Sequence, residues 1–149
     1  MLELLVVLQS HSVSNNQKEI TRYMTTDKGE ISYRCINSLI HSINWCLSTT
    51  DKIKIKLQVF DDHSDSTFIT RLNNLLTTAN FEYTVDSLDT HGIMPSILKC
   101  YEHGRDFGKD LVYFVQDDYL YYETCIWEMV DAFFQFRDKT KKAVCIYPY

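Results

Sequence analysis

Two short and almost uninterrupted apolar runs constrain the fold of this chain most. Residues 2–8 read LELLVVL and residues 111–115 read LVYFV. An alternating strand buries one face, whereas a continuous apolar run of this length is typical of a strand buried on both faces. Such strands occur in parallel sheets that helices cover on both sides. We therefore predict an α/β protein with these two strands in the middle of its sheet.

Helical and strand patterns alternate along the remaining sequence. Residues 53–59 and 81–85 alternate apolar with polar side chains, which predicts two strands nearer one edge of the sheet. Apolar residues recur at helical spacing in four segments, which predicts helices at residues 34–48, 66–79, 93–103 and 123–136. A last strand is predicted at residues 143–147. The polar residues 13–33 are predicted to form a long loop, with one helical turn left open as an alternative within it.

This alternation predicts one Rossmann-like domain over residues 1–149, with a mostly parallel open sheet and helices on both faces. If the continuous strands are central and the alternating strands lie toward one edge, the first four strands take the order 3-2-1-4. In this order the second and third strands are added on one side of the first strand and the fourth strand on the other side, so the direction of strand addition reverses between the first and fourth strands. Ligands of open α/β sheets bind at such a switch point, beyond the carboxyl ends of the strands.

Composition narrows the classes of partner and compartment. The formal net charge of −5 argues against nucleic acid or an anionic membrane as the main partner. The five cysteines are odd in number and include no Cys-x-x-Cys pair, which argues against a disulfide framework and a zinc knuckle. No apolar run approaches the roughly 18 residues that span a bilayer. We expect a soluble protein of the reducing cytoplasm with no membrane span.

Polar residues follow three of the predicted strands at the switch point. The three segments are Gln9-Ser10-His11, Asp61-Asp62-His63 and Gln116-Asp117-Asp118. One acidic pair after a strand is more often a turn or a helix cap than a metal site. Two pairs at neighbouring strand ends repel one another unless a cation joins them, and a hard divalent cation such as Mg²⁺ or Mn²⁺ brings phosphate oxygens with it.

Other ligand-binding patterns do not fit. The chain contains neither Gly-x-Gly-x-x-Gly nor the P-loop motif, so dinucleotide and P-loop binding are unsupported. An EF-hand loop from Asp61 fails, because its sixth and twelfth positions are Ser66 and Leu72. A phospho-receiver domain has the right size, but it needs an acidic pair where this chain has Gln9 and Ser10.

The strand ends resemble those of GT-A fold, family 2-type glycosyltransferases, in the N-terminal nucleotide-sugar-binding part. Residues 5–12 resemble the opening strand and its polar end, and residues 59–65 resemble the strand-Asp-Asp-Gly/Asn-Ser signature. Residues 112–121 resemble the segment with the Asp-x-Asp motif. The resemblance covers most of the chain except residues 13–33. It implies transfer of sugar from a nucleotide-diphosphate sugar, in first place a UDP-sugar, to a saccharide or other hydroxyl acceptor.

The resemblance also implies roles for residues that would bind the nucleotide. Gln9 and Ser10 would line the base, and Asp62 would accept a hydrogen bond from it. Lys99 lies near the family's Arg-Asn pair, where it would contact base or phosphate; it is equally well explained as a solvated helix lysine. Cys100 stands where the family usually has Asn.

For the metal, the resemblance implies a role for the last acidic pair. Asp117 would face the ribose or the metal, and Asp118 would hold the Mn²⁺ or Mg²⁺ ion that bridges the diphosphate. Val115 stands where many members have a first Asp, so the acidic motif is shorter here. The sequence offers no convincing general base, because His63 and His91 are predicted to be loop residues and His11 a packing or loop residue.

Two expectations concern what the 149 residues leave out. We expect the family's acceptor-binding half to be absent from them, so a noncatalytic or truncated nucleotide-binding or assembly module is the alternative function. Without that half, apolar residues near the C-terminus would be left uncovered and would form a homodimer interface. These residues are Trp127, Phe133, Phe136 and Tyr147.

Overall fold

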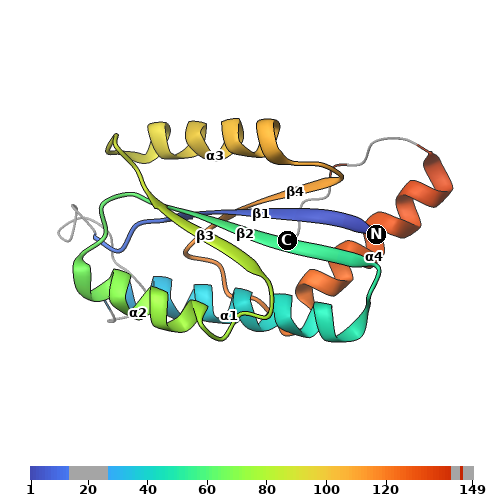
Figure 1. Cartoon of the computed structure of the whole chain (residues 1–149), viewed down its shortest axis with the longest axis horizontal. Helices are drawn as coiled ribbons and strands as arrows, with labels where there is room; N and C mark the ends of the chain where they lie inside the picture. Colours follow the sequence, from blue (N-terminus) through green and yellow to red (C-terminus); the bar gives the residue numbers. More distant parts are fainter. Residues whose placement is uncertain (14–26, 142–144, 146–149) are drawn as a thin grey trace.

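A computed structural model describes residues 1–13, 27–141 and 145 of the chain (Figure 1). The described strands are β1 (Leu2–Ser10), β2 (Ile53–Asp61), β3 (Glu82–Ser87) and β4 (Leu111–Gln116). The described helices are α1 (Lys28–Thr49), α2 (Ser66–Leu76), α3 (Ile93–Phe107) and α4 (Cys125–Thr140). The strand predicted at residues 143–147 falls largely outside the described residues.

The four strands form one parallel sheet in the order β3-β2-β1-β4, which confirms the predicted order 3-2-1-4. Strand β1 is central, and Leu8 pairs with Val59 of β2 on one side and with Val115 of β4 on the other. Strands β2 and β3 are added on one side of β1, and β4 is added on the other side. The switch point therefore lies between β1 and β4, where it was predicted.

Helices cover both faces of the sheet, as predicted. Figure 1 shows α3 alone on one face and α1, α2 and α4 together on the other. Leu4, Val6 and Leu8 of β1 belong to the larger core under α1, α2 and α4, whereas Leu5 and Val7 belong to the smaller core under α3. The central strand is thus buried on both faces, which explains its uninterrupted apolar sequence.

That residues 111–115 lie in the middle of the sheet stays a prediction, because the strand predicted at residues 143–147 falls largely outside the described residues. Among the described strands, β4 stands last, beside β1, and Phe114 is 40% exposed. The run is apolar because each face of β4 meets a helical layer. Phe114 packs edge-on against Tyr101 of α3, with ring centroids 4.6 Å apart, while Tyr113 packs against the larger core. The continuous apolar run of β4 therefore reports two covered faces.

The first turn of α1 lies where a loop was predicted. The helix begins at Lys28 and not at residue 34, because Asp27 caps it by accepting a hydrogen bond from the Gly29 N–H at 2.7 Å. Glu30 then pairs with Arg34 in the next turn and with Arg71 of α2, both at 2.8 Å. Polar capping and ion pairs hold this turn, so apolar periodicity gave no sign of it.

The other three helices are confirmed: α2 and α3 begin at the predicted residues, and the remaining ends differ from the predicted ones by two to four residues. Asp65 caps α2 by accepting the Phe68 N–H at 2.9 Å. Trp127 and Phe133 of α4 pack against the larger core, and Phe136 is 54% exposed. The homodimer stays a prediction. Among the described helices, none combines the length and the apolar character needed to cross a bilayer.

Two serines one turn apart on α1 fasten the segment that leads into α4. Ser38 Oγ accepts the Tyr121 N–H and Ser42 Oγ accepts the Ile126 N–H, each at 3.0 Å. The first N–H groups of a helix have no acceptor within the helix. Ser42 Oγ therefore supplies an acceptor for the Ile126 N–H in the first turn of α4.

We expect Ser42→Ala to lower the free energy of unfolding by about 1–3 kcal/mol, because the Ile126 N–H is left buried without an acceptor. Ser48→Ala is the matched control: Ser48 is an exposed serine of the same helix, and its loss should cost no more than about 0.5 kcal/mol. Urea denaturation of both variants measures the two values, and equal losses would contradict the role of Ser42.

Candidate functional site

The carboxyl ends of β1, β2 and β4 lie side by side at one edge of the sheet. Ser10 pairs with Asp61 across β1 and β2, and Gln9 pairs with Gln116 across β1 and β4. The Asp62 N–H continues the first ladder by donating to the Ser10 carbonyl at 2.8 Å. The parallel register therefore brings the three polar segments of the sequence to one place.

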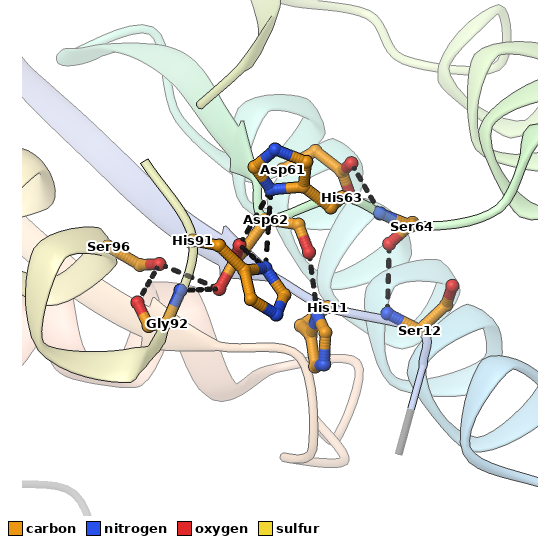
Figure 2. Close-up of polar contacts among 9 residues, drawn as sticks. All are labelled: His11, Ser12, Asp61, Asp62, His63, Ser64, His91, Gly92 and Ser96. Atoms are coloured by element: carbon orange, nitrogen blue, oxygen red, sulfur yellow. Dashed lines mark hydrogen bonds and ion pairs between the residues drawn. The ribbon is translucent and has the colours of Figure 1, made fainter. Parts of the chain in front are cut away.

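Asp62 is the centre of the polar contacts at this edge (Figure 2). Its side chain is only 4% exposed. Its Oδ1 lies 3.0 Å from His63 Nδ1 and 2.8 Å from His91 Nδ1. Its Oδ2 accepts the Gly92 N–H at 3.0 Å and the Ser96 hydroxyl at 3.1 Å. Both carboxylate oxygens are thus held by groups from the β2–α2 and β3–α3 segments.

These contacts set the charge of Asp62. Burial by itself raises the pKa of this carboxyl group, but hydrogen bonds from His63, Gly92, Ser96 and His91 outweigh burial and lower the pKa from 3.8 to about 2. Asp62 is therefore a carboxylate at neutral pH. Its predicted role as a partner of the nucleotide base stays a prediction.

His11 connects Asp62 to the last acidic pair. Its ring Nδ1 lies 2.6 Å from the Asp62 carbonyl oxygen, and its backbone N–H donates to Asp117 Oδ2 at 2.8 Å. Lys28 Nζ lies 3.5 Å from the same oxygen of Asp117. Asp117 is buried and forms an ion pair with Lys28 at the start of α1, whereas Asp118 is exposed. The two acids of the pair therefore differ: one is held by the protein and the other faces solvent.

Two buried polar atoms at the same edge have no hydrogen-bond partner among the described residues. They are Ser10 Oγ and Asp61 Oδ1. Asp61 uses its other oxygen to accept the Ser64 N–H at 3.0 Å, which shapes the turn after β2. Ser10 is fully buried, so of the two residues predicted to line the base it is the less accessible.

Gln9 lies in a groove between α3 and the ends of β1 and β4. The groove has a volume of about 200 Å³, and Gln9 and Gln116 are its polar side chains at the strand ends. The other lining residues are Val7, Ile97, Cys100, Tyr101, Phe114, Val115 and Tyr119. Lys99 is exposed on α3, next to Cys100 in the wall of the groove.

Sequence reasoning missed four residues of this site. Lys28 fell in a predicted loop, and His63, His91 and Ser96 received no binding role. One signal was available: His63 directly follows the second acidic residue, and His91 directly precedes Gly92 at the start of α3. Neither spacing shows that the two imidazoles meet, because they are 28 residues apart in sequence.

Asp62, His63 and His91 also form a group that can hold a metal ion. One ligand atom from each residue lies within 4.8 Å of the others. This group of one oxygen and two nitrogen donors differs from Asp117 and Asp118, which offer oxygens alone.

No protein-family model matches the sequence, and no curated protein matches it. Among solved structures, the chain is similar to S. aureus TarS, a glycosyltransferase, with a TM-score of 0.56 and 15% sequence identity. The match covers 93% of this chain and 20% of TarS, so the chain spans about one fifth of the length of TarS. A likeness at this identity concerns the fold. The chain thus shares an α/β fold with part of TarS, in agreement with the fold that the resemblance of its strand ends implied.

Proposed function

We propose that the chain is a nucleotide-sugar-binding domain of a glycosyltransferase. The donor would be a nucleotide-diphosphate sugar, a UDP-sugar in first place, and the acceptor a saccharide or another hydroxyl compound. One observation carries the proposal: a glycosyltransferase-like fold presents an exposed carboxylate, Asp118, at the switch point between β1 and β4.

The groove beside α3 is the proposed place of the nucleotide. Gln9 would contact the base there, Ser10 and Asp62 would shape the edge next to it, and Lys99 would reach base or phosphate from α3. Tyr101, Phe114 and Tyr119 line the same groove and supply the flat apolar surface on which a base stacks.

A Mn²⁺ or Mg²⁺ ion fits the last acidic pair, because both residues offer hard oxygen donors. Asp118 would hold the ion, and Asp117, whose Oδ2 is fixed by His11 and Lys28, would face the ribose or the ion. When bound, the ion supplies positive charge that stabilises a diphosphate leaving group. Lys28 adds a fixed positive charge at the same place.

Thermal unfolding with UDP tests this proposal. A ligand at about 100 times its Kd stabilises the native state by about 2.7 kcal/mol. Because the proposed ion would join the diphosphate to Asp118, we expect UDP to raise the melting temperature more with Mn²⁺ than with a chelator. Asp118→Asn should remove the metal dependence and leave the fold intact, since an amide is a poorer ligand for a hard cation.

Asp51→Asn is the matched control for this experiment. Asp51 is also exposed, but it precedes β2 and lies at the opposite edge of the sheet. Its replacement should leave the UDP shift unchanged. Equal UDP shifts with and without metal in the unmodified chain would contradict the proposed cation site.

A nucleotide-binding module without transferase activity is the second candidate. Its ground is that the sequence offers no convincing general base. Nδ1 of His11, His63 and His91 each contacts an oxygen of Asp62, which leaves only Nε2 of each ring for that role. UDP binding without release of UDP from any UDP-sugar, over a panel of sugars and hydroxyl acceptors, would favour this candidate.

A further inference from the structure

We propose that Asp62, His63 and His91 form a binding site for a late first-row divalent cation such as Zn²⁺. This site is separate from the Mg²⁺ or Mn²⁺ site of the proposed function and does not depend on transferase activity.

The three donor atoms already lie in a triangle of the right size. Asp62 Oδ1 is 3.0 Å from His63 Nδ1 and 2.8 Å from His91 Nδ1, and the two nitrogens are 3.4 Å apart. A tetrahedral ion with bonds of about 2.0–2.1 Å needs ligand atoms roughly 3.3 Å apart. Shifts of a few tenths of an ångström, well within side-chain freedom, therefore admit the ion.

The carboxylate is oriented as a metal ligand is. The Gly92 N–H and the Ser96 hydroxyl hold Oδ2, which leaves Oδ1 directed at the two imidazoles. In metal sites, such outer hydrogen bonds fix the orientation of a ligand and raise its affinity for the ion.

The histidine rings approach Asp62 from two segments that the fold brings together. His63 has a φ of 58°, in the left-handed region that non-glycine residues seldom adopt, and this conformation belongs to the sharp turn after β2. His91 precedes the start of α3, and the two rings meet edge to face with centroids 5.0 Å apart. Both nitrogens lie beside one carboxylate oxygen (Figure 2). A cation among the three atoms would take the place of the protons that these hydrogen bonds use.

Donor chemistry and exposure select the class of ion. Two imidazole nitrogens and one carboxylate suit Zn²⁺, Co²⁺ or Fe²⁺ better than Mg²⁺, which prefers oxygens alone. The side chains of His63 and His91 are 47% and 53% exposed, whereas that of Asp62 is 4% exposed. The ion would have three protein ligands on one side and an open position toward solvent, as in sites that bind a water or an anionic ligand.

Titration of the tag-free chain with Zn²⁺, and with Co²⁺ as a spectroscopic probe, tests the site. We expect one ion per chain and visible Co²⁺ absorption bands of nitrogen and oxygen ligation. His63→Gln and His91→Gln should each lower the affinity at least about tenfold. The matched control is His41→Gln, an exposed histidine on α1, which should leave the affinity unchanged.

Three results would overturn the proposal. Unchanged affinity in both histidine variants would leave Asp62 as a hydrogen-bonding centre only. A strong sulfur-to-cobalt charge-transfer band would place the ion on a cysteine. Loss of binding in Asp118→Asn, with the histidine variants unaffected, would place Zn²⁺ at the last acidic pair. The UDP experiment uses Mn²⁺ and no Zn²⁺, so failure of the proposed function and failure of the Zn²⁺ site can be told apart.

Nuclear magnetic resonance of the unmodified chain gives a result that needs no variant. On adding Zn²⁺ we expect the imidazole signals of His63 and His91 to shift while that of His41 does not. A shift of His41 alone, or of none of the histidines, would contradict the proposed site.

Discussion

Replacing Asp62 by alanine is expected to lower the free energy of unfolding by about 2–3 kcal/mol. The pKa of Asp62 falls from 3.8 to about 2 in the folded chain. Each pKa unit corresponds to about 1.4 kcal/mol, so the folded state favours this carboxylate by about 2 kcal/mol. The variant also leaves the Gly92 N–H without its acceptor, whereas the Ser96 hydroxyl keeps the Gly92 carbonyl, 2.7 Å away.

Urea denaturation followed by circular dichroism measures this loss. Asp118→Ala is the matched control, because Asp118 is an exposed aspartate at the same edge of the sheet and should change stability by no more than about 0.5 kcal/mol. Equal stabilities of the two variants would show that the contacts of Asp62 add nothing to folding.

The loss should also depend on pH in a defined direction. The folded pKa of Asp62 lies below the unfolded value of 3.8, so its stabilisation is present above that value. The stabilisation is lost as the pH falls from 3.8 toward about 2. The difference between the unmodified chain and Asp62→Ala should therefore be constant at neutral pH and shrink over that interval. A difference that persisted in full at still lower pH would contradict this origin.

Local patterns were sufficient to predict the sheet. The apolar run of β1 reported burial by helices on both faces, and the alternation in β2 placed that strand nearer an edge. The order β3-β2-β1-β4 followed from these two facts and from right-handed crossovers. The apolar run of β4 has the same origin, because Tyr101 of α3 and the larger core cover its two faces.

Apolar periodicity could not predict the start of α1, although the Asp27 cap and the Glu30–Arg34 pair are local. Its first turn is held by Glu30, which pairs with Arg71 at a separation of 41 residues, and by the pairing of Lys28 with Asp117 across 89 residues. Such contacts exist only after the sheet has formed. A sequence window around residue 30 therefore shows a polar segment without helical periodicity.

The candidate site divides in the same way. The meeting of the strand ends followed from parallel topology, so Asp62 and Asp117 were expected at one edge. Their partners were not, because His91 reaches Asp62 only when the residues after β3 turn back toward β2. The Leu88 N–H donates to the Asp61 carbonyl at 2.9 Å and begins that return. The roles of the predicted nucleotide-binding residues stay predictions.

Leu39→Ala is expected to lower the free energy of unfolding by about 2–5 kcal/mol, which is more than the loss expected for Asp62→Ala. Leu39 is fully buried on α1, in the core that this helix shares with β1, β2 and α4. Truncation removes apolar contacts and leaves a cavity that the surrounding strands fill only in part. Because α1 also carries Lys28 beside Asp117, loosening this helix should weaken UDP binding in the presence of Mn²⁺ as well.

The matched control is Leu98→Ala. Leu98 is also a helical leucine, but on α3 it is 55% exposed, so its truncation should cost at most about 0.5 kcal/mol. Urea denaturation of both variants decides between two arrangements of the helices. A large loss for Leu39 and a small one for Leu98 is the result expected if α1 lies on the sheet and this face of α3 faces solvent. The reverse order would mean that α3, and not α1, covers the main core, and the edge that carries Asp62 and Asp117 would then have to be built differently.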